Sequence, residues 1–478
     1  MSISTIVILA LYVIVLGGGG ISLLVKTSLI GRAAKKRNTT KAVGDRFGSR
    51  YGFIISVVGM CVGVGSLWRF PMMCAKWGGG AFVLAFVIIC LTIVIPAGWA
   101  ELAYGRHYRS GTIGCGKAIA GNMGIAYGWM QSIVSLGVWC YYPAVMSLII
   151  IYIFKSFTGL STITKNSSKV YENANDNKTL IYVFVVLVLL VVALIVARGI
   201  ERGIERFCKI LLPILLIAIV IVAVRVCMIP GIGEGIDYYI KPDWQQLANP
   251  KMWTAAAGTA LFAVGLGPGC LLVYGRYVDD EQDIATDFIT INIIQLFICI
   301  LSGLIIIPTV QSMGMDPTSM GRGIMFVALP KVFETIPGGE IFFSLFLMAL
   351  LVGGITSSFN QLEVATSALM DKDGFAFSRR RAIAVCFAVA ILVAIACTFN
   401  DDFYTKYDLF FANFGYNICA FILIVLIGWK YGAAKARKEW YLPTSAIKWG
   451  GFIDYLYKYL ALFAFGYFTV TSFIALFQ

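Results

Sequence analysis

The sequence is poor in ionisable side chains. Only 13% of its 478 residues are Asp, Glu, Lys or Arg, and it contains a single histidine, His107. One histidine gives no basis for a histidine metal site, and the twelve cysteines are scattered, with no pair at metal-ligand spacing. No nucleophile–base set accompanies them. The sequence therefore predicts neither an enzyme nor a bound cofactor.

Apolar residues, in contrast, make up 59% of the chain. A soluble protein of this length would not carry so many long apolar runs, so we expect a polytopic membrane protein. The formal net charge of +13 raises the question of a nucleic-acid partner. The basic residues lie in short loops between apolar spans, however, which is the positive-inside pattern that sets orientation in a membrane. We therefore expect a lipid bilayer and no nucleic acid as partner.

Two glycine-rich interruptions divide apolar segments. The first is Gly59-Met-Cys-Val-Gly-Val-Gly-Ser-Leu-Trp-Arg-Phe-Pro71, and the second is Gly265-Leu-Gly-Pro-Gly269. A helix that loses its regularity inside the bilayer leaves backbone groups unpaired, at a cost of several kcal/mol per group. Such breaks persist where the backbone lines a cavity or holds an ion, so the two interruptions predict a binding site near the midplane.

Several motifs resemble the neurotransmitter:sodium symporter family, in particular its bacterial amino-acid transporters. The resemblance implies an all-α polytopic membrane protein with a 5+5 inverted-repeat transporter fold, in which core helices 1 and 6 are broken. The motifs follow the family order from about Arg46 to the C-terminus: Gly63-Val-Gly-Ser-Leu-Trp-Arg-Phe-Pro71, Trp77-Gly-Gly-Gly-Ala-Phe82, Tyr141-Tyr142, Gly203 to Pro213, Gly354-Ile-Thr-Ser-Ser358 and Lys406-Tyr-Asp-Leu-Phe410.

Residues 1–40 fall outside this resemblance, and residues 41–478 form the predicted symporter domain. The apolar run Ile3–Ile30 precedes its basic cluster, the reverse of a signal peptide, so we expect an uncleaved leading transmembrane helix and a basic linker. It resembles a small accessory subunit fused to the transporter, and both a docked helix and a simple anchor stay open. The core is expected to hold eleven transmembrane helices, at residues 50–73, 80–105, 122–155, 180–197, 204–228, 252–277, 286–310, 340–370, 380–398, 403–429 and 454–477.

The resemblance implies a firm sodium site between the first and eighth core helices. Carbonyl and hydroxyl oxygens supply such a site without burying a net charge. A second sodium site is doubtful, because the family's asparagine, threonine and asparagine are replaced by Ser66, Ala263 and Gln295. Chloride is also disfavoured, since Phe86 and Cys299 stand where hydroxyl groups are expected. The firm sodium site is expected to use Gly59, Val62, Gly353, Thr356 and Ser357.

The substrate site implied by the resemblance lies beside the two breaks. Freed amides and helix N-termini favour an anionic group such as an amino acid's carboxylate. The amide of Gln361 and the space left at Gly265 suggest a medium-sized side chain that is not purely aliphatic. The expected substrate-binding residues are Cys61, Gly63, Gly65, Val138, Tyr142, Phe262, Gly265, Pro268, Ser358 and Gln361.

The resemblance also implies a gate on each side of the site. Arg69 and Asp408 match the family's external ion pair, and charges at membrane depth are costly unless paired. On the inner side Asp371 and Tyr277 match, whereas the family's basic residue is missing. We expect Arg46 to replace it as the partner of Asp371.

The leading hypothesis is a sodium-coupled symporter that imports an amino acid by alternating access across a bacterial inner membrane. The alternatives are a proton-coupled transporter of the same fold and a ligand-binding membrane receptor that does not transport. No ionisable residue lies between Lys209 and Arg225, where such a proton-coupled transporter can carry a lysine, and this disfavours the first alternative. The matched gates disfavour the second.

Overall fold

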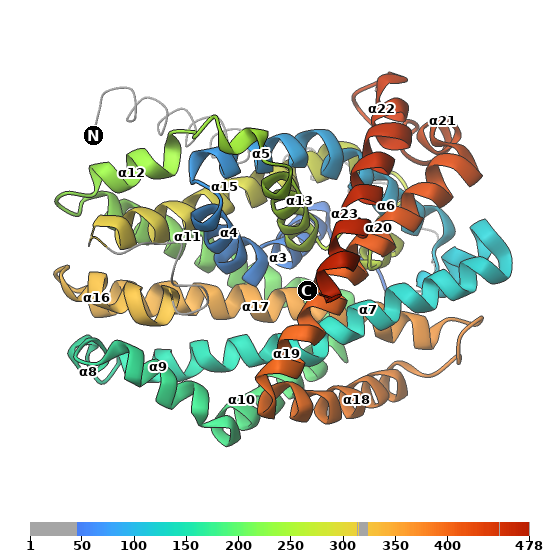
Figure 1. The fold of residues 1–478 in the computed structure, drawn as a ribbon. Helices are drawn as coiled ribbons and strands as arrows, with labels where there is room; N and C mark the ends of the chain where they lie inside the picture. Colours follow the sequence, from blue (N-terminus) through green and yellow to red (C-terminus); the bar gives the residue numbers. More distant parts are fainter. Residues whose placement is uncertain (1–44, 313, 315–323, 449, 478) are drawn as a thin grey trace.

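The computed structural model describes residues 45–312, 314, 324–448 and 450–477, and these form a helical bundle (Figure 1). Nine of the described helices are long and apolar enough to cross a membrane, and the bent pair Arg50–Cys61 and Gly65–Lys76 gives a tenth. The predicted all-helical membrane fold is therefore confirmed. The leading helix predicted at Ile3–Ile30 lies outside the described residues.

Short turns of other helix types (η) interrupt several of the long helical units; η13 is a 3-10 helix, and the other η elements named here are π-helical. In chain order the units are α3 (Arg50–Cys61), η3 (Gly65–Arg69) and α4 (Phe70–Lys76); α5 (Gly80–Ile89), η4 (Cys90–Val94) and α6 (Ile95–Tyr108); α7 (Thr112–Ser156); α10 (Lys178–Val196); η5 (Ile200–Glu205) and α11 (Arg206–Cys227); α13 (Pro250–Val264) and α14 (Cys270–Arg276); α15 (Ile284–Ser312); α17 (Gly339–Met370); α18 (Arg379–Phe399); α19 (Asp401–Asp408), η9 (Leu409–Gly415), α20 (Tyr416–Val425), η10 (Leu426–Gly432), α21 (Ala433–Ala436) and η11 (Arg437–Tyr441); and α22 (Phe452–Tyr455), η12 (Leu456–Ala461), α23 (Leu462–Ile474) and η13 (Ala475–Phe477).

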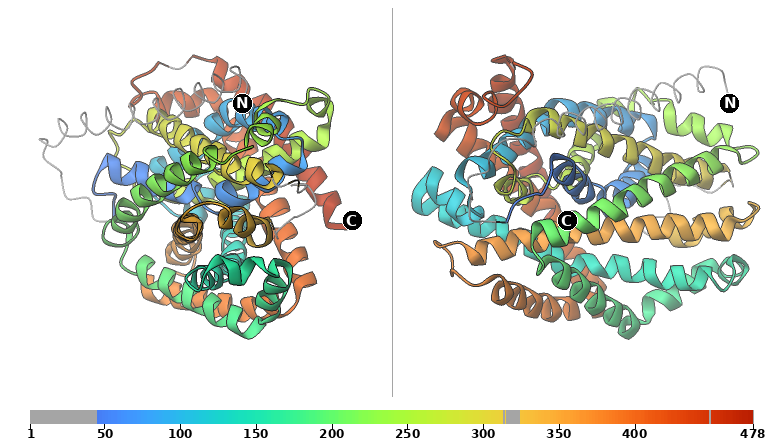
Figure 2. Two further views of the ribbon diagram at one scale, coloured as in Figure 1. Left: turned by 90° about the vertical axis from the view of Figure 1, so that its left-hand side faces the viewer. Right: turned by 180° about the vertical axis from the view of Figure 1, so that it is seen from behind.

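Four long helices form one side of the bundle. α7 and α17 pack along much of their length, and α10 and α18 pack against both of them. In Figure 1 these four lie below the broken helices, and Figure 2 shows the same arrangement from one end and from behind. The short elements α8 (Leu160–Thr164), α9 (Ser167–Asp176), α12 (Gly233–Ile240) and α16 (Leu329–Glu334) join the units.

The predicted start of the third core helix agrees with the structure. A core helix was expected from residue 122, and α7, which begins at Thr112, turns sharply at Gly121, whose φ is 58°, so the helix after the turn begins at residue 122. The segment before the turn is a separate short helix in geometry. Only glycine adopts such a φ at no steric cost, so Gly121 sets the turn between the two parts.

The first interruption separates α3 from η3 and α4, and the chain bends there by 48°. Small residues allow a close approach at this point. A Cβ on Gly63 would lie 2.1 Å from Ser357 Oγ, and one on Gly65 would lie 2.9 Å from Phe262 Cδ1. The glycines therefore let the break pack directly against α17 and α13.

The second interruption joins α13 to α14 through residues 265–269. Gly265, Gly267 and Gly269 have φ values of 66°, 107° and 88°, a region that disfavours any residue with a Cβ. The freed backbone groups find partners on neighbouring helices. Gly267 N and Gly269 N donate to the buried carboxylate of Glu101 at 3.0 and 3.1 Å.

We predict that Gly267→Ala destabilises the protein, because its φ is 107° and a Cβ would lie 2.8 Å from Tyr416 O and Ala420 N. Backbone strain of this kind costs about 1–3 kcal/mol before the steric contact is counted. Thermal unfolding in detergent measures the effect. Gly258→Ala is the control, since a Cβ there meets nothing within 4 Å inside α13. Equal unfolding temperatures for both variants would contradict the assignment.

Candidate functional site

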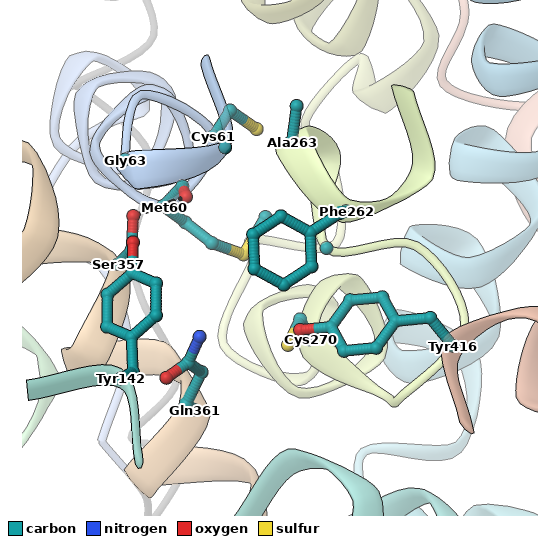
Figure 3. A pocket seen from close by; sticks show the side chains of 12 residues that line it. Met60, Cys61, Gly63, Tyr142, Phe262, Ala263, Cys270, Ser357, Gln361 and Tyr416 are labelled. Atoms are coloured by element: carbon teal, nitrogen blue, oxygen red, sulfur yellow. Dashed lines mark hydrogen bonds between the residues drawn. The ribbon is translucent and has the colours of Figure 1, made fainter. Parts of the chain in front are cut away.

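A small cavity lies where the two interruptions meet. It measures about 20 Å³, enough for roughly one water molecule, so the side chains around it are closed in this conformation. Figure 3 shows these side chains arriving from both breaks and from α7, α17 and α20. The cavity is lined by Met60, Cys61, Gly63, Gly65, Tyr142, Phe262, Ala263, Gly265, Cys270, Ser357, Gln361 and Tyr416.

The structure brings most of the predicted substrate residues together at this cavity. Three of them do not line it: Val138, Pro268 and Ser358. The Ser358 hydroxyl instead donates to Gly354 O of its own helix, at 3.0 Å. The hydroxyl's preference for the i−4 carbonyl of a membrane helix explains why the motif alone did not predict its direction.

Three lining residues were missed by the sequence reasoning: Met60, Cys270 and Tyr416. Met60 and Cys270 stand at the edges of the two interruptions, so their position next to the breaks was the available signal. Tyr416 begins α20, which is far from both breaks in the sequence. Its ring lies 5.4 Å from that of Phe262, a contact that no local pattern indicates.

One wall of the cavity is built around Tyr142. Val64 N donates to Tyr142 Oη at 2.9 Å, so the phenol oxygen already accepts from the first interruption. The phenol hydrogen is therefore left to donate elsewhere. The N–H of Gly63, one residue earlier, donates to no acceptor among the described residues. Gly63 and Tyr142 both line the cavity, so two potential hydrogen-bond donors lie beside it.

A set of oxygen atoms converges between α3 and α17. Thr356 Oγ1 lies 2.9 Å from Gly59 O and 3.1 Å from Gly353 O. Ser357 Oγ lies 3.4 Å from the same Gly59 oxygen. Val62 O faces Gly353 so closely that a Cβ there would be 2.4 Å away. All five residues predicted for the firm sodium site are therefore adjacent, with neutral oxygens of the kind that hard cations prefer.

The residues of the doubtful second site make a different arrangement. Ser66 Oγ donates to Cys61 O at 2.7 Å, so that hydroxyl is engaged. Gln295 turns its amide nitrogen toward the site, 3.4 Å from Ser66 Oγ and 3.1 Å from Cys299 Sγ. Ala263 contributes no side-chain oxygen. A nitrogen donor and a thiol therefore occupy space where a cation would need oxygen atoms.

The predicted external ion pair is wrong in this conformation. No ion pair within 4.0 Å joins Arg69 and Asp408 in the described part of the chain. Arg69 donates instead to Asn413 Oδ1 and lies over the Phe262 ring, 5.0 Å from its centroid. Asp408 accepts a hydrogen bond from Tyr141 Oη at 2.5 Å. Asn413 lies on the same helical rod as Asp408 and receives the guanidinium in its place.

The predicted inner pair is also wrong. Arg46 faces Asp280 at 3.7 Å rather than Asp371. The Asp371 carboxylate accepts from Gly111 N and Gly114 N at 2.9 and 3.0 Å, and so satisfies amides at the start of α7. The cation that faces Asp371 is Arg276, at 3.8 Å.

Asp280 lies in the loop between α14 and α15 and is surrounded by basic residues. Its partial burial alone would raise the pKa of the carboxyl. The hydrogen bond from Arg109 and the charges of Arg109, Arg46 and Arg106 outweigh that effect and lower the pKa. The carboxylate is therefore held in its charged form as the centre of this cluster.

Three buried glutamates, Glu101, Glu205 and Glu363, were missed, although an ionisable residue inside a membrane helix is a functional candidate by default. Glu101 holds the second interruption, as described above. Glu363 accepts from Tyr277 Oη at 2.7 Å and forms an ion pair with Arg379, which also faces Asp45 at 3.9 Å. Tyr277, a predicted inner-gate residue, thus belongs to a network that joins α14, α17, α18 and the segment before α3.

Comparison with known proteins finds a matching family model, related sequences and a similar solved structure. A family model described as the sodium:neurotransmitter symporter family matches residues 44–180 and 165–477. A sodium-dependent transporter of Methanocaldococcus jannaschii is 29% identical over 440 residues, covering 86% of this chain and 87% of the relative. The sodium-dependent serotonin transporter of Drosophila melanogaster is 25% identical over 406 residues, covering 75% and 64%. The solved structure of MhsT with L-phenylalanine has a TM-score of 0.83 at 26% identity, covering 90% of this chain and all of that one.

We predict that Arg379→Ala strongly destabilises the protein, because it leaves the buried Glu363 carboxylate without its cation. Breaking a buried pair costs about 3–5 kcal/mol. Lys406→Ala is the matched control, since its ion pair with Asp402 is 73% and 75% exposed and contributes about 0–1 kcal/mol. Denaturant unfolding compares the two. Losses of similar size would show that the inner network is not a buried ion pair.

Proposed function

Because this chain belongs to the sodium:neurotransmitter symporter family, we propose that it imports an amino acid together with sodium by alternating access across a bacterial inner membrane. The observation that carries this proposal is the junction of Gly59, Thr356 and Ser357 beside a closed cavity at two helix breaks. The family is one of sodium-dependent transporters, which fits the prediction that the chain is not an enzyme. The substrate class and the number of ions belong to the proposal.

Sodium would be held by the oxygens that converge between α3 and α17. Thr356 and Ser357 supply hydroxyls, and Gly59, Val62 and Gly353 supply carbonyls. A neutral set of this kind holds a monovalent cation without leaving a buried negative charge when the ion departs. That property suits an ion that must be released in every transport cycle.

The carboxylate of the substrate would lie at the end of the cavity that carries two donors. Gly63, Gly65 and Tyr142 all line the cavity, and the Gly63 amide and the Tyr142 hydroxyl would donate to that carboxylate. None of the lining residues is an aspartate or glutamate. A cationic amine without a carboxylate would therefore have no counter-charge there, and an amino acid fits better. The complex of MhsT with L-phenylalanine supports the same class.

The side chain of the substrate would extend toward Gln361. This residue is 5% exposed, and its amide oxygen has no partner among the described residues. A buried unpaired acceptor costs about 1–3 kcal/mol, which a hydrogen-bonding substrate recovers. Met60 and Cys270 supply polarizable walls nearby. We propose a medium-sized side chain that carries a polar group or a sulfur atom.

A single sodium ion per substrate is part of the proposal. Ser66 offers an engaged hydroxyl, Ala263 offers no side-chain oxygen, and Gln295 turns an amide nitrogen inward. Each lost ion–oxygen contact costs on the order of 1–3 kcal/mol, or roughly ten- to hundred-fold in affinity. The second site would therefore bind sodium far more weakly than the first.

Uptake into proteoliposomes tests the sodium assignment. We expect uptake to require sodium, to show a Hill coefficient near one for sodium, and to change little when chloride is replaced. Thr356→Ala should raise the sodium concentration at half-maximal uptake by roughly ten- to hundred-fold, because one oxygen is lost. Ser147→Ala is the control, since its buried hydroxyl bonds only to Pro143 O of its own helix. Equal uptake in potassium, or two or more sodium ions per substrate from reversal potentials, would refute the proposal.

A competition panel of amino acids tests the role of Gln361. Gln361→Leu keeps a similar volume but removes the amide, so we expect it to lower the apparent affinity for polar side chains by roughly ten-fold and to spare apolar ones. Asn360→Leu removes a neighbouring buried amide outside the cavity lining and should not change the ranking. An unchanged ranking in the Gln361 variant would remove this residue from the specificity site.

A further inference from the structure

An apolar groove lies between α20 and α23, on the surface of the bundle. It has a volume of about 710 Å³, and its walls are almost entirely apolar: Phe421, Val425, Trp429, Leu462, Phe463, Gly466 and Tyr467. Gly466 is the only lining residue without a side chain. A Cβ at that position would already touch the Phe421 ring at 3.4 Å. The groove thus opens directly onto the backbone of α23.

The span that carries this groove is the least covered one in the described bundle. Only 17% of the most apolar window of Phe452–Phe477 is buried, against 39–89% for the other eight long spans. Apolarity alone needs no protein partner in lipid, because lipid tails are as apolar as the side chains. A groove with an exposed glycine is different, since small residues allow the close backbone packing that drives helix association in membranes.

The described chain begins next to the loop that leads into this span. Arg46 lines a cavity of about 350 Å³ together with Trp440, Pro443 and Thr444. Asp45, the first described residue, accepts a hydrogen bond from Ile200 N at 3.0 Å and faces Arg379 at 3.9 Å, so the described chain begins between this loop and the start of η5. A linker of the 14 residues 31–44 spans at most roughly 50 Å, more than the diameter of several helices, so the preceding segment can reach the groove.

The depth and direction of the leading segment also match the groove. Ile3–Ile30 is long enough to cross the bilayer and carries Gly17-Gly-Gly-Gly20 near its middle. Gly466 lies near the middle of the 26-residue span Phe452–Phe477. The basic residues that follow Ile30 belong on the same side as Lys435–Lys438, which precede that span. The segment would therefore run antiparallel to α23, with glycines facing glycine at one depth.

We propose that the apolar segment Ile3–Ile30 of the same chain docks as a transmembrane helix in the groove between α20 and α23, with Gly17–Gly20 against Gly466. The docked helix would cover the exposed face of the last span. This assignment goes beyond transport and does not depend on the substrate or the ion. It assigns an occupant to a surface that the transport site does not use.

Photo-crosslinking of the full chain in proteoliposomes tests the docking directly. A photoreactive phenylalanine analogue at Leu462 should form a crosslink to residues 1–30, identified by mass spectrometry. The same residue at Leu392, on α18 and 68% exposed, should crosslink to lipid alone. Crosslinks to lipid alone from Leu462 would overturn the proposal, whether or not the protein transports.

Two further experiments test whether the crosslink depends on the groove and whether the helix comes from the same chain. Gly466→Trp fills the groove and should abolish most of the Leu462 crosslink, whereas Val470→Trp adds the same bulk on α23 outside the groove lining and should not. Mixing unlabelled and ¹⁵N-labelled chains identifies the source of the helix. Crosslinks between differently labelled chains would place a second copy in the groove and overturn the assignment to the same chain.

Discussion

The structure depends on one constraint: two helices are broken inside an apolar bundle, and the backbone groups freed there must be paired. An unpaired peptide group in such surroundings costs several kcal/mol. At the second break, Glu101 accepts from Gly267 N and Gly269 N, and Gln131 Nε2 donates to Gly267 O at 2.7 Å. At the first break, Ser66 Oγ and Thr356 Oγ1 donate to freed carbonyls. The side chains that stabilise the breaks therefore also define the site.

The same requirement accounts for the glycines and for the position of the cavity. Side chains at Gly63 and Gly267 would collide with Ser357 and with the backbone of α20, so the partners of the freed groups could not approach. Once those groups are paired, Gly63 and Tyr142 stay beside the cavity as hydrogen-bond donors. A small set of donors suits an anionic group. The binding chemistry proposed for the site follows from incomplete pairing at the break.

Local features explain how much was predictable from the sequence. Apolar runs and glycine clusters are contiguous, so the helical membrane fold and its two interruptions could be predicted. The group of oxygen atoms around Thr356 and Ser357 could be predicted, because the residues from each of the two helices lie within one sequence motif. Its role in sodium binding stays a prediction. Arg46 and Arg69 were assigned wrong partners. Their long side chains can reach several polar groups that the fold brings close from distant parts of the sequence. Arg46 pairs with Asp280, and Arg69 with Asn413. The buried Glu363 could have been found, since a lone carboxylate in an apolar run requires a partner.

The two predicted gates are held by different chemistry, which bears on how the chain could alternate. At the predicted outer gate, the Arg69 guanidinium lies over the Phe262 ring and donates to the neutral Asn413. At the predicted inner gate, Tyr277 belongs to a network with Glu363 and Arg379, in which the carboxylate is fully buried. Opening the outer side separates a cation from a ring and an amide, whereas opening the inner side must rehydrate or re-pair a buried charge. An ion between Gly59 and Thr356 would tie α3 to α17, the helix that carries Glu363. Loss of that ion would therefore loosen the inner side, the one that the fold otherwise holds more firmly.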